Sequence, residues 1–413
     1  MHKYIFIVGK PDPFSASAHA IREAGFSVGV FLDKLVTLKN PSDYDAVVPV
    51  DFSDPVSLDT LAIPDLSIAG LVCTYENYIL AKARLAEKLQ LPGISPESAL
   101  LCTDKMLMRQ AFADYDESLS PAFGEIASVE EATRFAQAHG FPVIIKPANL
   151  VKSLLVIRCD DREQLEASTR YALSQLHGLY KQYRVYGRAP RLIIEQFMEG
   201  QLYSVAAFAG SDGQATICPG VAALTNAAQA GFDDNFLYRR ALPAHIDEQL
   251  QDRLFEAARR GMAALKLRSS PAHVELIHTT QNTIKIIEIG ARIGGYRPRM
   301  YRLSYGMDLA AMEVANAASE PLIDTQAPLK GYTAVYELFP HTTGAFDALV
   351  PAEHVRIVAK RVHSLNIKAK RGAKCGPAKD GYKATAVVIV QDADYTEFMA
   401  KCAEVERLQV ALL

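Results

Sequence analysis

Residues 273–295 read HVELIHTTQNTIKIIEIGARIGG, and this stretch decides the fold. Two short apolar segments flank a polar turn, a pattern that predicts a β-hairpin. A two-residue turn at Gln281 and Asn282 would place Leu276 opposite Ile287. The apolar side chains then share one face of the hairpin, because side chains alternate along a strand.

The same register predicts two carboxylates side by side on the other face. Glu275 lies opposite Glu288. Directly opposed like charges cost several tenths of a kcal/mol to about 1 kcal/mol, so a cation between them is expected. Mg²⁺ suits such a site because it binds through one or two carboxylates and completes its shell with phosphate oxygens and water, and Mn²⁺ is an alternative ion. A solvated hairpin face with a different register is the alternative interpretation.

Arg292 and two glycines follow the second carboxylate. Arg292 lies four residues after Glu288, at the same strand parity, so its guanidinium can reach phosphates that a metal holds. Gly294 and Gly295 allow the backbone to come close to a ligand.

HVE followed by IIEIGARIGG resembles the metal-binding strands of the ATP-grasp superfamily, and the best match is to carboxylate–amine ligases such as the L-amino-acid ligases. The resemblance implies ATP as the nucleotide, Glu275 and Glu288 as ligands of Mg²⁺, and Arg292 as a catalytic cation. It extends over about residues 103–318.

The order of elements predicts an α/β and α+β chain with three parts. Residues 1–95 alternate strands and helices, which indicates a Rossmann-like domain with a parallel sheet, although a GxGxxG motif is absent. Residues 96–320 contain short β-branched segments typical of antiparallel sheets, and form the expected ATP-grasp domain. Residues 321–413 are expected to complete the ATP-grasp fold as a C-terminal α+β region.

Two lysines match the nucleotide lysines of the family. Lys105 begins a helix for which Thr103 is the expected N-cap. Lys146, in FPVIIKPA, follows a strand, and the resemblance implies that it reaches the α- and β-phosphates. A lysine at a strand end is alternatively a solvated residue.

RLIIEQFMEG resembles the strand that links the two halves of the nucleotide cleft. The family's ribose-binding glutamate aligns with Leu202, so Glu199 or Gln201 would have to replace it. The family's metal-binding Asn aligns with Gly290. The resemblance implies an adenine slot lined by the backbone of Glu195, Gln196 and Met198, with Phe197 nearby.

The loop KPANLVKSLLV departs from the family pattern, which has glycines after the second lysine. Glycine amides can fold over phosphates, whereas Leu150, Val151 and Leu155 make such a loop stiffer. Lys152 and Ser153 are therefore expected to carry more of the γ-phosphate contact, and residues 149–153 are the predicted lid.

An arginine cluster follows the double glycine. Arg297 and Arg299 are the predicted ligands of a carboxylate substrate, because a guanidinium fork matches a planar carboxylate. A solvated helix start is the alternative. His273, beside Glu275, is expected to be packed or hydrogen-bonded, since Mg²⁺ prefers oxygen.

Composition limits the function classes. A net charge of −3 and a pI near 6.4 provide no basic field for nucleic acid. Six scattered cysteines without a CxxC pair indicate neither a zinc site nor a disulfide framework. No segment has the length of a signal core or a membrane span, so a cytoplasmic protein is expected, with no membrane partner. A homodimer is left open.

The predicted function is ATP- and Mg²⁺-dependent coupling of a small-molecule carboxylate to an amine through an acyl phosphate. Two alternatives remain open: a nucleotide-binding protein with weak or lost catalysis, and a carboxyphosphate-forming enzyme similar to carbamoyl-phosphate synthase. The sequence does not identify the two substrates, because specificity depends on loop side chains.

Overall fold

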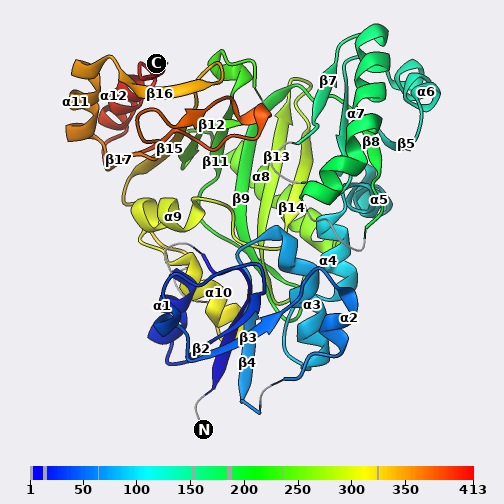
Figure 1. Cartoon of the computed structure of the whole chain (residues 1–413), viewed down its shortest axis with the longest axis vertical. Helices are drawn as coiled ribbons and strands as arrows, with labels where there is room; N and C mark the ends of the chain where they lie inside the picture. The colour runs from blue at the N-terminus through cyan, green and yellow to red at the C-terminus, as the bar shows by residue number, and fades with distance from the viewer. Residues whose placement is uncertain are drawn as a thin grey trace.

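The computed structural model describes residues 3–12, 16–63, 65–150, 154–183, 188–234, 236–322 and 325–413. Its N-terminal sheet has four parallel strands in the order β3-β2-β1-β4 (Figure 1). The central strands are apolar because helices cover both faces of a parallel sheet. The predicted Rossmann-like sheet is confirmed, with strands β1 (Tyr4–Gly9), β2 (Ser27–Asp33), β3 (Ala46–Val50) and β4 (Ile68–Val72), and helices α1 (Ala16–Glu23), α2 (Pro55–Asp59) and α3 (Ile79–Lys88).

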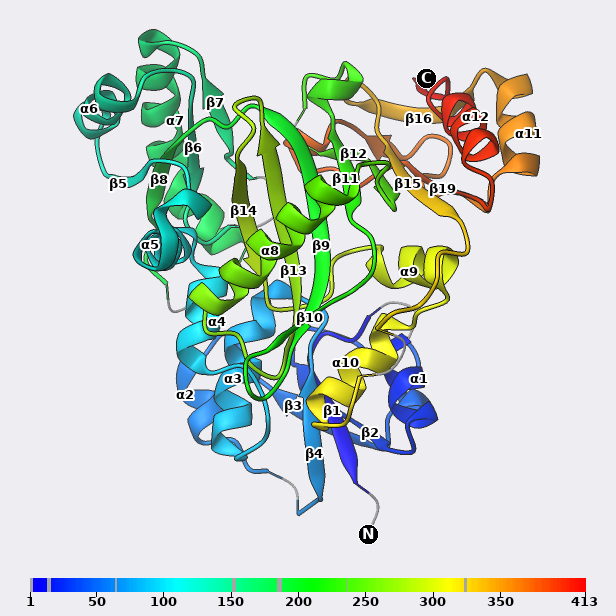
Figure 2. The same ribbon diagram turned by 180° about the vertical axis from the view of Figure 1, so that it is seen from behind.

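A helix from much later in the chain completes this N-terminal layer. Helix α10 (Leu309–Ala317) packs beside α1 on the parallel sheet, as Figures 1 and 2 show. Gly70 permits the close approach, because a Cβ there would lie 2.4 Å from the carbonyl oxygen of Ala317. The N-terminal packed layer therefore includes α10, which lies beyond the predicted boundary near residue 95.

Two helices connect the N-terminal layer to the rest of the chain. Helix α4 (Pro96–Thr103) leads directly into α5 (Lys105–Asp116). Asp104, not Thr103, caps α5, because its carboxylate accepts from the first amides of that helix. The predicted cap at Thr103 is wrong: its hydroxyl donates to the carbonyl of Ala99 and is used within α4.

A small antiparallel sheet follows, in the order β5-β8-β6-β7. Helix α6 (Val129–His139) and the 21-residue helix α7 (Arg162–Gln182) pack against it over a separate apolar core. Within the described ranges, neither α7 nor any other helix combines the length and apolarity that a membrane crossing requires. The strands are β5 (Phe123–Ile126), β6 (Val143–Pro147), β7 (Ile157–Cys159) and β8 (Leu192–Gln196).

The largest sheet runs through the centre of the molecule in the order β14-β13-β9-β11-β12-β15-β19-β17, with β10 beside β9. Helix α8 (Glu248–Ala264) covers its β9, β13 and β14 end (Figure 2). The strands are β9 (Gly200–Ala209), β10 (Ala215–Ile217), β11 (Ala222–Asn226), β12 (Leu237–Leu242), β13 (Ser270–Thr279), β14 (Ile284–Gly290), β15 (Tyr332–Leu338), β17 (Ser364–Ile367) and β19 (Ala386–Asp392).

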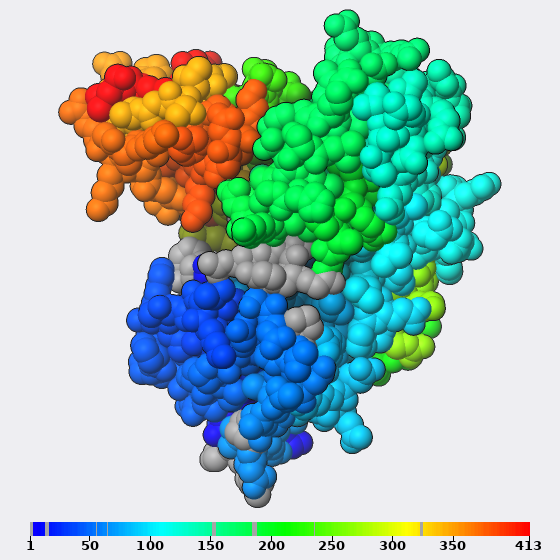
Figure 3. All heavy atoms as spheres, turned by 45° about the vertical axis from the view of Figure 1, so that its right-hand side comes forward, coloured from blue at the N-terminus to red at the C-terminus, as the bar shows by residue number. Residues whose placement is uncertain are grey.

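The C-terminal part contributes three strands to that central sheet and adds a small layer of its own. In Figure 3 this part and the small sheet form two lobes above the N-terminal domain. The predicted mixture of a parallel N-terminal sheet and later antiparallel sheets is therefore confirmed. The added elements are β16 (Gly344–Val350), β18 (Lys374–Cys375), β20 (Gln409–Leu412), α11 (Ala352–Arg361) and α12 (Tyr395–Val405).

Candidate active site

The hairpin of β13 and β14 turns over more residues than the sequence predicts. The amide of Thr279 donates to the carbonyl of Thr283 at 2.9 Å, so the turn contains residues 280–282 and not only Gln281 and Asn282. Asn282 adopts a left-handed conformation with φ of 60°. The predicted two-residue turn at Gln281 and Asn282 is wrong by one residue.

A β-bulge compensates for the longer turn. Leu276 pairs with Ile286, but the next pair along the hairpin is Glu275 with Glu288. Ile287 is thus the extra residue of the bulge, and its predicted pairing with Leu276 is wrong. The predicted pairing of the two carboxylates is confirmed, and their role as metal ligands stays a prediction.

The neighbouring strand extends this polar row across the sheet. Ser204 on β9 pairs with Glu275, and Arg297 donates to its hydroxyl at 2.5 Å. His273 Nε2 lies 3.1 Å from Glu275 Oε1, so His273 is hydrogen-bonded as expected. Burial alone would raise the pKa of the Glu275 carboxyl, but His273 and Arg297 lower it to about 2. Glu275 is therefore an anion at neutral pH.

Arg292 meets a carboxylate that the sequence analysis missed. Its Nε lies 2.7 Å from Oε2 of Glu76, which follows strand β4 in the N-terminal domain. Gly290 makes room for this contact, because a Cβ there would lie 2.9 Å from the same oxygen. Burial raises the pKa of Glu76 while Arg292 opposes that shift, and Glu76 Oε1 has no hydrogen-bond partner among the described residues. In the sequence, the only signal for Glu76 was that its loop directly follows an apolar strand.

The two predicted nucleotide lysines lie at the small sheet. Lys146 Nζ lies 2.7 Å from Oε2 of Glu195, and both side chains are buried. Burial lowers the pKa of Lys146 to about 8, although the carboxylate of Glu195 opposes that shift. Lys105 Nζ donates to the carbonyl of Leu150 at 2.8 Å. The charge of Lys105 contributes to lowering the pKa of Lys146, so the two lysines act on one another.

Arg109 is a second residue that the sequence analysis missed. It is 1% exposed, and its guanidinium donates to both oxygens of Glu195, with Nε at 2.8 Å. Burial would raise the pKa of Glu195, but Arg109 and Lys146 lower it to about 2. The signal was present in the sequence, since Arg109 lies on the same helical face as Lys105 and the apolar Phe112.

The linker between the two sheets has its amides partly engaged. The amide of Gln196 donates to Ala122 at 2.9 Å and that of Phe197 to Pro142 at 3.0 Å. Arg158 lies over the ring of Phe197, 4.3 Å from its centroid. Arg158 therefore covers one face of the Phe197 ring, and the adenine slot stays a prediction.

The remaining linker residues connect to the central sheet. The carbonyl of Glu199 accepts from the amide of Thr280 at 3.0 Å, while its side chain is exposed. Met198 is half-buried. Gln201 donates to the carbonyl of Leu224, so its amide group is engaged with the sheet. The ribose assignment to Glu199 stays a prediction.

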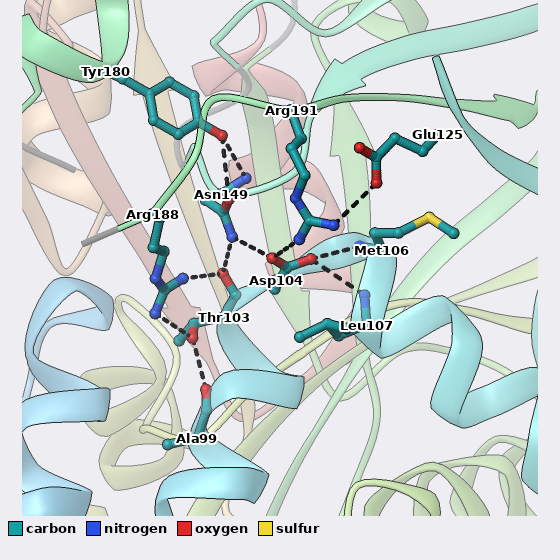
Figure 4. Close-up of polar contacts among 10 residues, drawn as sticks. All are labelled: Ala99, Thr103, Asp104, Met106, Leu107, Glu125, Asn149, Tyr180, Arg188 and Arg191. Carbon is teal, nitrogen blue, oxygen red and sulfur yellow. Dashed lines mark hydrogen bonds and ion pairs between the residues drawn. The ribbon is translucent and has the colours of Figure 1, made fainter. Parts of the chain in front are cut away.

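A polar joint fixes the start of α5 against the small sheet (Figure 4). The Asp104 carboxylate accepts from Arg191 and from the side chain of Asn149. Asn149 also bonds Tyr180, and Arg188 donates to the carbonyl of Thr103. Because Asn149 begins the predicted lid, this joint anchors one end of it. Lys152 and Ser153 lie outside the described residues, so their predicted roles stay predictions.

The structure separates the two predicted substrate arginines. Arg297, the first residue of α9 (Arg297–Tyr305), is 2% exposed and turns toward the sheet. Burial, and then the charge of Arg240, lower the pKa of Arg297 to about 10, and its Nε has no hydrogen-bond partner among the described residues. Arg299 is exposed and acts on His363 of the C-terminal part. Of the two arginines, only Arg297 lies beside Ser204 and Glu275.

The chemistry of the Glu275–Glu288 pair matches that of a divalent-cation site. Glu275 and Glu288 face one another on one side of the sheet, which is the one- or two-carboxylate set that Mg²⁺ takes alongside phosphate oxygens. No group of three or more His, Cys, Asp or Glu side chains in the described part of the chain is arranged to bind a metal alone. A metal ion held by this pair would take its remaining ligands from outside the pair, such as phosphate oxygens or water.

Residues 139–298 match the family model described as an ATP-grasp domain. The chain contains an ATP-grasp domain. The L-amino acid ligase of Bacillus licheniformis superposes with a TM-score of 0.79 at 20% identity, covering 100% of this chain and 99% of that one. This likeness shows that the two chains share one fold over their whole length.

Two sequence relatives are similar to this chain over most of its length. This chain is 25% identical over 333 residues to the alanine–anticapsin ligase of Bacillus subtilis, covering 75% of this chain and 68% of that protein. It is 26% identical over 302 residues to the uncharacterized protein y4rH of Sinorhizobium fredii. That match covers 70% of this chain but only 59% of the relative's length.

Proposed function

We propose that this ATP-grasp protein uses ATP and Mg²⁺ to activate a carboxylate as an acyl phosphate and couples it to an amine, releasing ADP and phosphate. The observation that carries the proposal is the Glu275–Glu288 pair, beside which Arg292 and Arg297 place their charges. Similarity to alanine–anticapsin ligase and the L-amino acid ligase fold support it. Arg292 acts on both carboxylates and Arg297 on Glu275, while Lys105 and Lys146 are the cations that we assign to the nucleotide phosphates.

The mechanism follows from charge. A substrate carboxylate oxygen attacks the γ-phosphorus, the bond to the β-phosphate oxygen breaks, and ADP leaves. Two anions must approach, so catalysis depends on positioning and neutralisation. Mg²⁺, held by Glu275 and Glu288, supplies charge neutralisation on the phosphates when bound. Lys105 and Lys146 hold phosphate oxygens, and Arg292 neutralises charge on the transferred phosphoryl group.

The second half-reaction forms the amide bond. An amine attacks the acyl carbon, the carbon–oxygen bond to phosphate breaks, and the amine loses a proton. The acyl phosphate must be protected from water until then, which requires a closed site. Arg297 is the group we assign to the substrate carboxylate, because it is buried and its Nε has no partner among the described residues.

A phosphate-release screen tests the proposal. Purified protein is mixed with ATP, Mg²⁺ and pairs of small carboxylates and amines, and release above the single-substrate background is expected for at least one pair. Glu275→Gln is the control that should abolish this release. Release that requires only bicarbonate would identify a carboxyphosphate former. Nucleotide binding without release for any pair would identify the weakly catalytic alternative.

A further inference from the structure

The bulge in β14 is required for the carboxylate pair. From the turn inward, Leu276 pairs with Ile286, and an unbroken register would put Ile287 opposite Glu275. Glu288 would then point to the opposite face, because successive side chains alternate. The one-residue bulge is what returns Glu288 to the face of Glu275.

A bulge leaves backbone groups without ladder partners, and a buried orphan carbonyl is costly. Arg109 reaches from helix α5 to the two carbonyls at this bulge. Its Nη1 donates to Ile286 at 3.0 Å and its Nη2 to Ile287 at 2.8 Å. These contacts stabilise the bulged conformation directly beside Glu288.

The same guanidinium also binds a residue of the small sheet. Nε and Nη2 of Arg109 donate to Glu195 on β8, and the second oxygen of Glu195 holds Lys146. Arg109 therefore connects β14 of the central sheet to β8 and β6 of the small sheet. The planar guanidinium fork can span these partners at once, whereas the single ammonium of a lysine cannot.

We propose that Arg109 is a positioning residue that couples the metal strand to the phosphate lysine. By holding the β14 bulge and Glu195 together, it fixes the position of Glu288 relative to Lys146. The metal bound at Glu288 and the phosphates bound by Lys146 can then belong to the same nucleotide. The proposal rests on the proposed function, since it assumes that Glu275 and Glu288 bind a divalent cation.

The test compares Arg109→Lys with Arg253→Lys. The first keeps the charge beside Glu195 but cannot bridge to β14. The second is a matched control, because Arg253 also holds a backbone carbonyl of this hairpin, at Asn282 in the turn. Mn²⁺ binding is measured by electron paramagnetic resonance with saturating ADP, and ADP binding by calorimetry in chelator. Thermal unfolding of each variant is recorded alongside.

Arg109→Lys is expected to weaken Mn²⁺ binding by about 10- to 100-fold, the usual effect of removing a group that orients a metal ligand. ADP binding without metal should change little, and Arg253→Lys should change neither affinity. Wild-type Mn²⁺ affinity in Arg109→Lys would overturn the proposal. Equal weakening of Mn²⁺ and metal-free ADP binding would also overturn it, since that pattern indicates general loss of structure.

Two further variants keep the outcome interpretable. If Arg109→Lys does not fold, Glu195→Gln is tested in its place. This change keeps an acceptor oxygen but weakens the interaction with the Arg109 guanidinium. Weaker Mn²⁺ binding is again expected, and unchanged Mn²⁺ binding would contradict the proposed coupling. Glu275→Gln tests the underlying assumption. If Glu275→Gln binds Mn²⁺ as the wild type does, the metal site and the proposed function fail, whatever Arg109→Lys shows.

Discussion

Arg292 Nε lies 2.7 Å from Glu76 Oε2, so a residue of the N-terminal domain orients a cation just beyond the end of β14. Glu76→Ala should leave Arg292 without this partner and lower kcat about tenfold, equivalent to about 1.4 kcal/mol in the barrier. The KM for ATP should change little, because Lys105 and Lys146 remain. Glu76→Gln, which keeps an acceptor, should lose less activity. An unchanged kcat in Glu76→Ala would show that Arg292 needs no such support.

The Glu275→Gln, Glu288→Gln double variant should fold but lose Mg²⁺-dependent turnover by at least about 10²- to 10³-fold. Its unfolding free energy should remain close to that of the wild type. Removing the repulsion between the carboxylates is favourable, but the attraction of Glu275 to His273 and Arg297 is lost as well. Urea unfolding and coupled-assay kinetics measure the two effects. A stable variant with full turnover would remove the metal assignment.

Nucleotide affinity should depend on pH through Lys146. Burial lowers its pKa to about 8, so its ammonium is lost as the pH rises through about 8 in the free protein. ADP affinity should therefore be full below that pH and fall above it by up to about tenfold per pH unit. Calorimetry from about pH 7 to about pH 9.5 measures the slope. Lys146→Arg, which stays charged, should flatten the profile. A flat wild-type profile would indicate that Lys146 does not contact phosphate.

Phe197 should support the adenine ring. Phe197→Ala is expected to weaken ADP binding by about 1–3 kcal/mol, the range for losing an aromatic platform under a base. Phe135→Ala is a matched control, since the ring of Phe135 lies against the ring of His139 on helix α6, with centroids 4.5 Å apart. Calorimetry compares the two variants. A crystal structure with nucleotide on the N-terminal sheet near Gly9 would exclude this location.

The sequence predicted the sheets better than the side-chain contacts. Periodicity and β-branched runs depend on local chemistry, so the parallel N-terminal strands and the β13–β14 hairpin could be recognised. The correct pairing of Glu275 with Glu288 arose because two deviations cancel: the turn is longer by one residue, and the bulge at Ile287 shifts the register back.

The missed residues have a common physical cause. Arg109 acts on residues 86 and 177 positions away in the chain, Glu195 and Ile286. Glu76 meets Arg292 only after the N-terminal domain packs against the end of β14. The helical spacing of Arg109 could mark the face on which it lies, but the partners of both residues depend on how whole sheets pack together, which no local pattern in the chain reveals.

Helix α10 places a constraint on how the protein is made. Its residues Ala310, Val314 and Ala317 cover apolar side chains of the first strands, Ile5 and Ile7 among them. Those strands emerge from the ribosome long before α10 is synthesised. Until then, the apolar side chains that α10 covers in the folded protein remain exposed on the nascent chain. A fragment ending near residue 95 would keep these side chains exposed, and is expected to aggregate rather than fold as an independent domain.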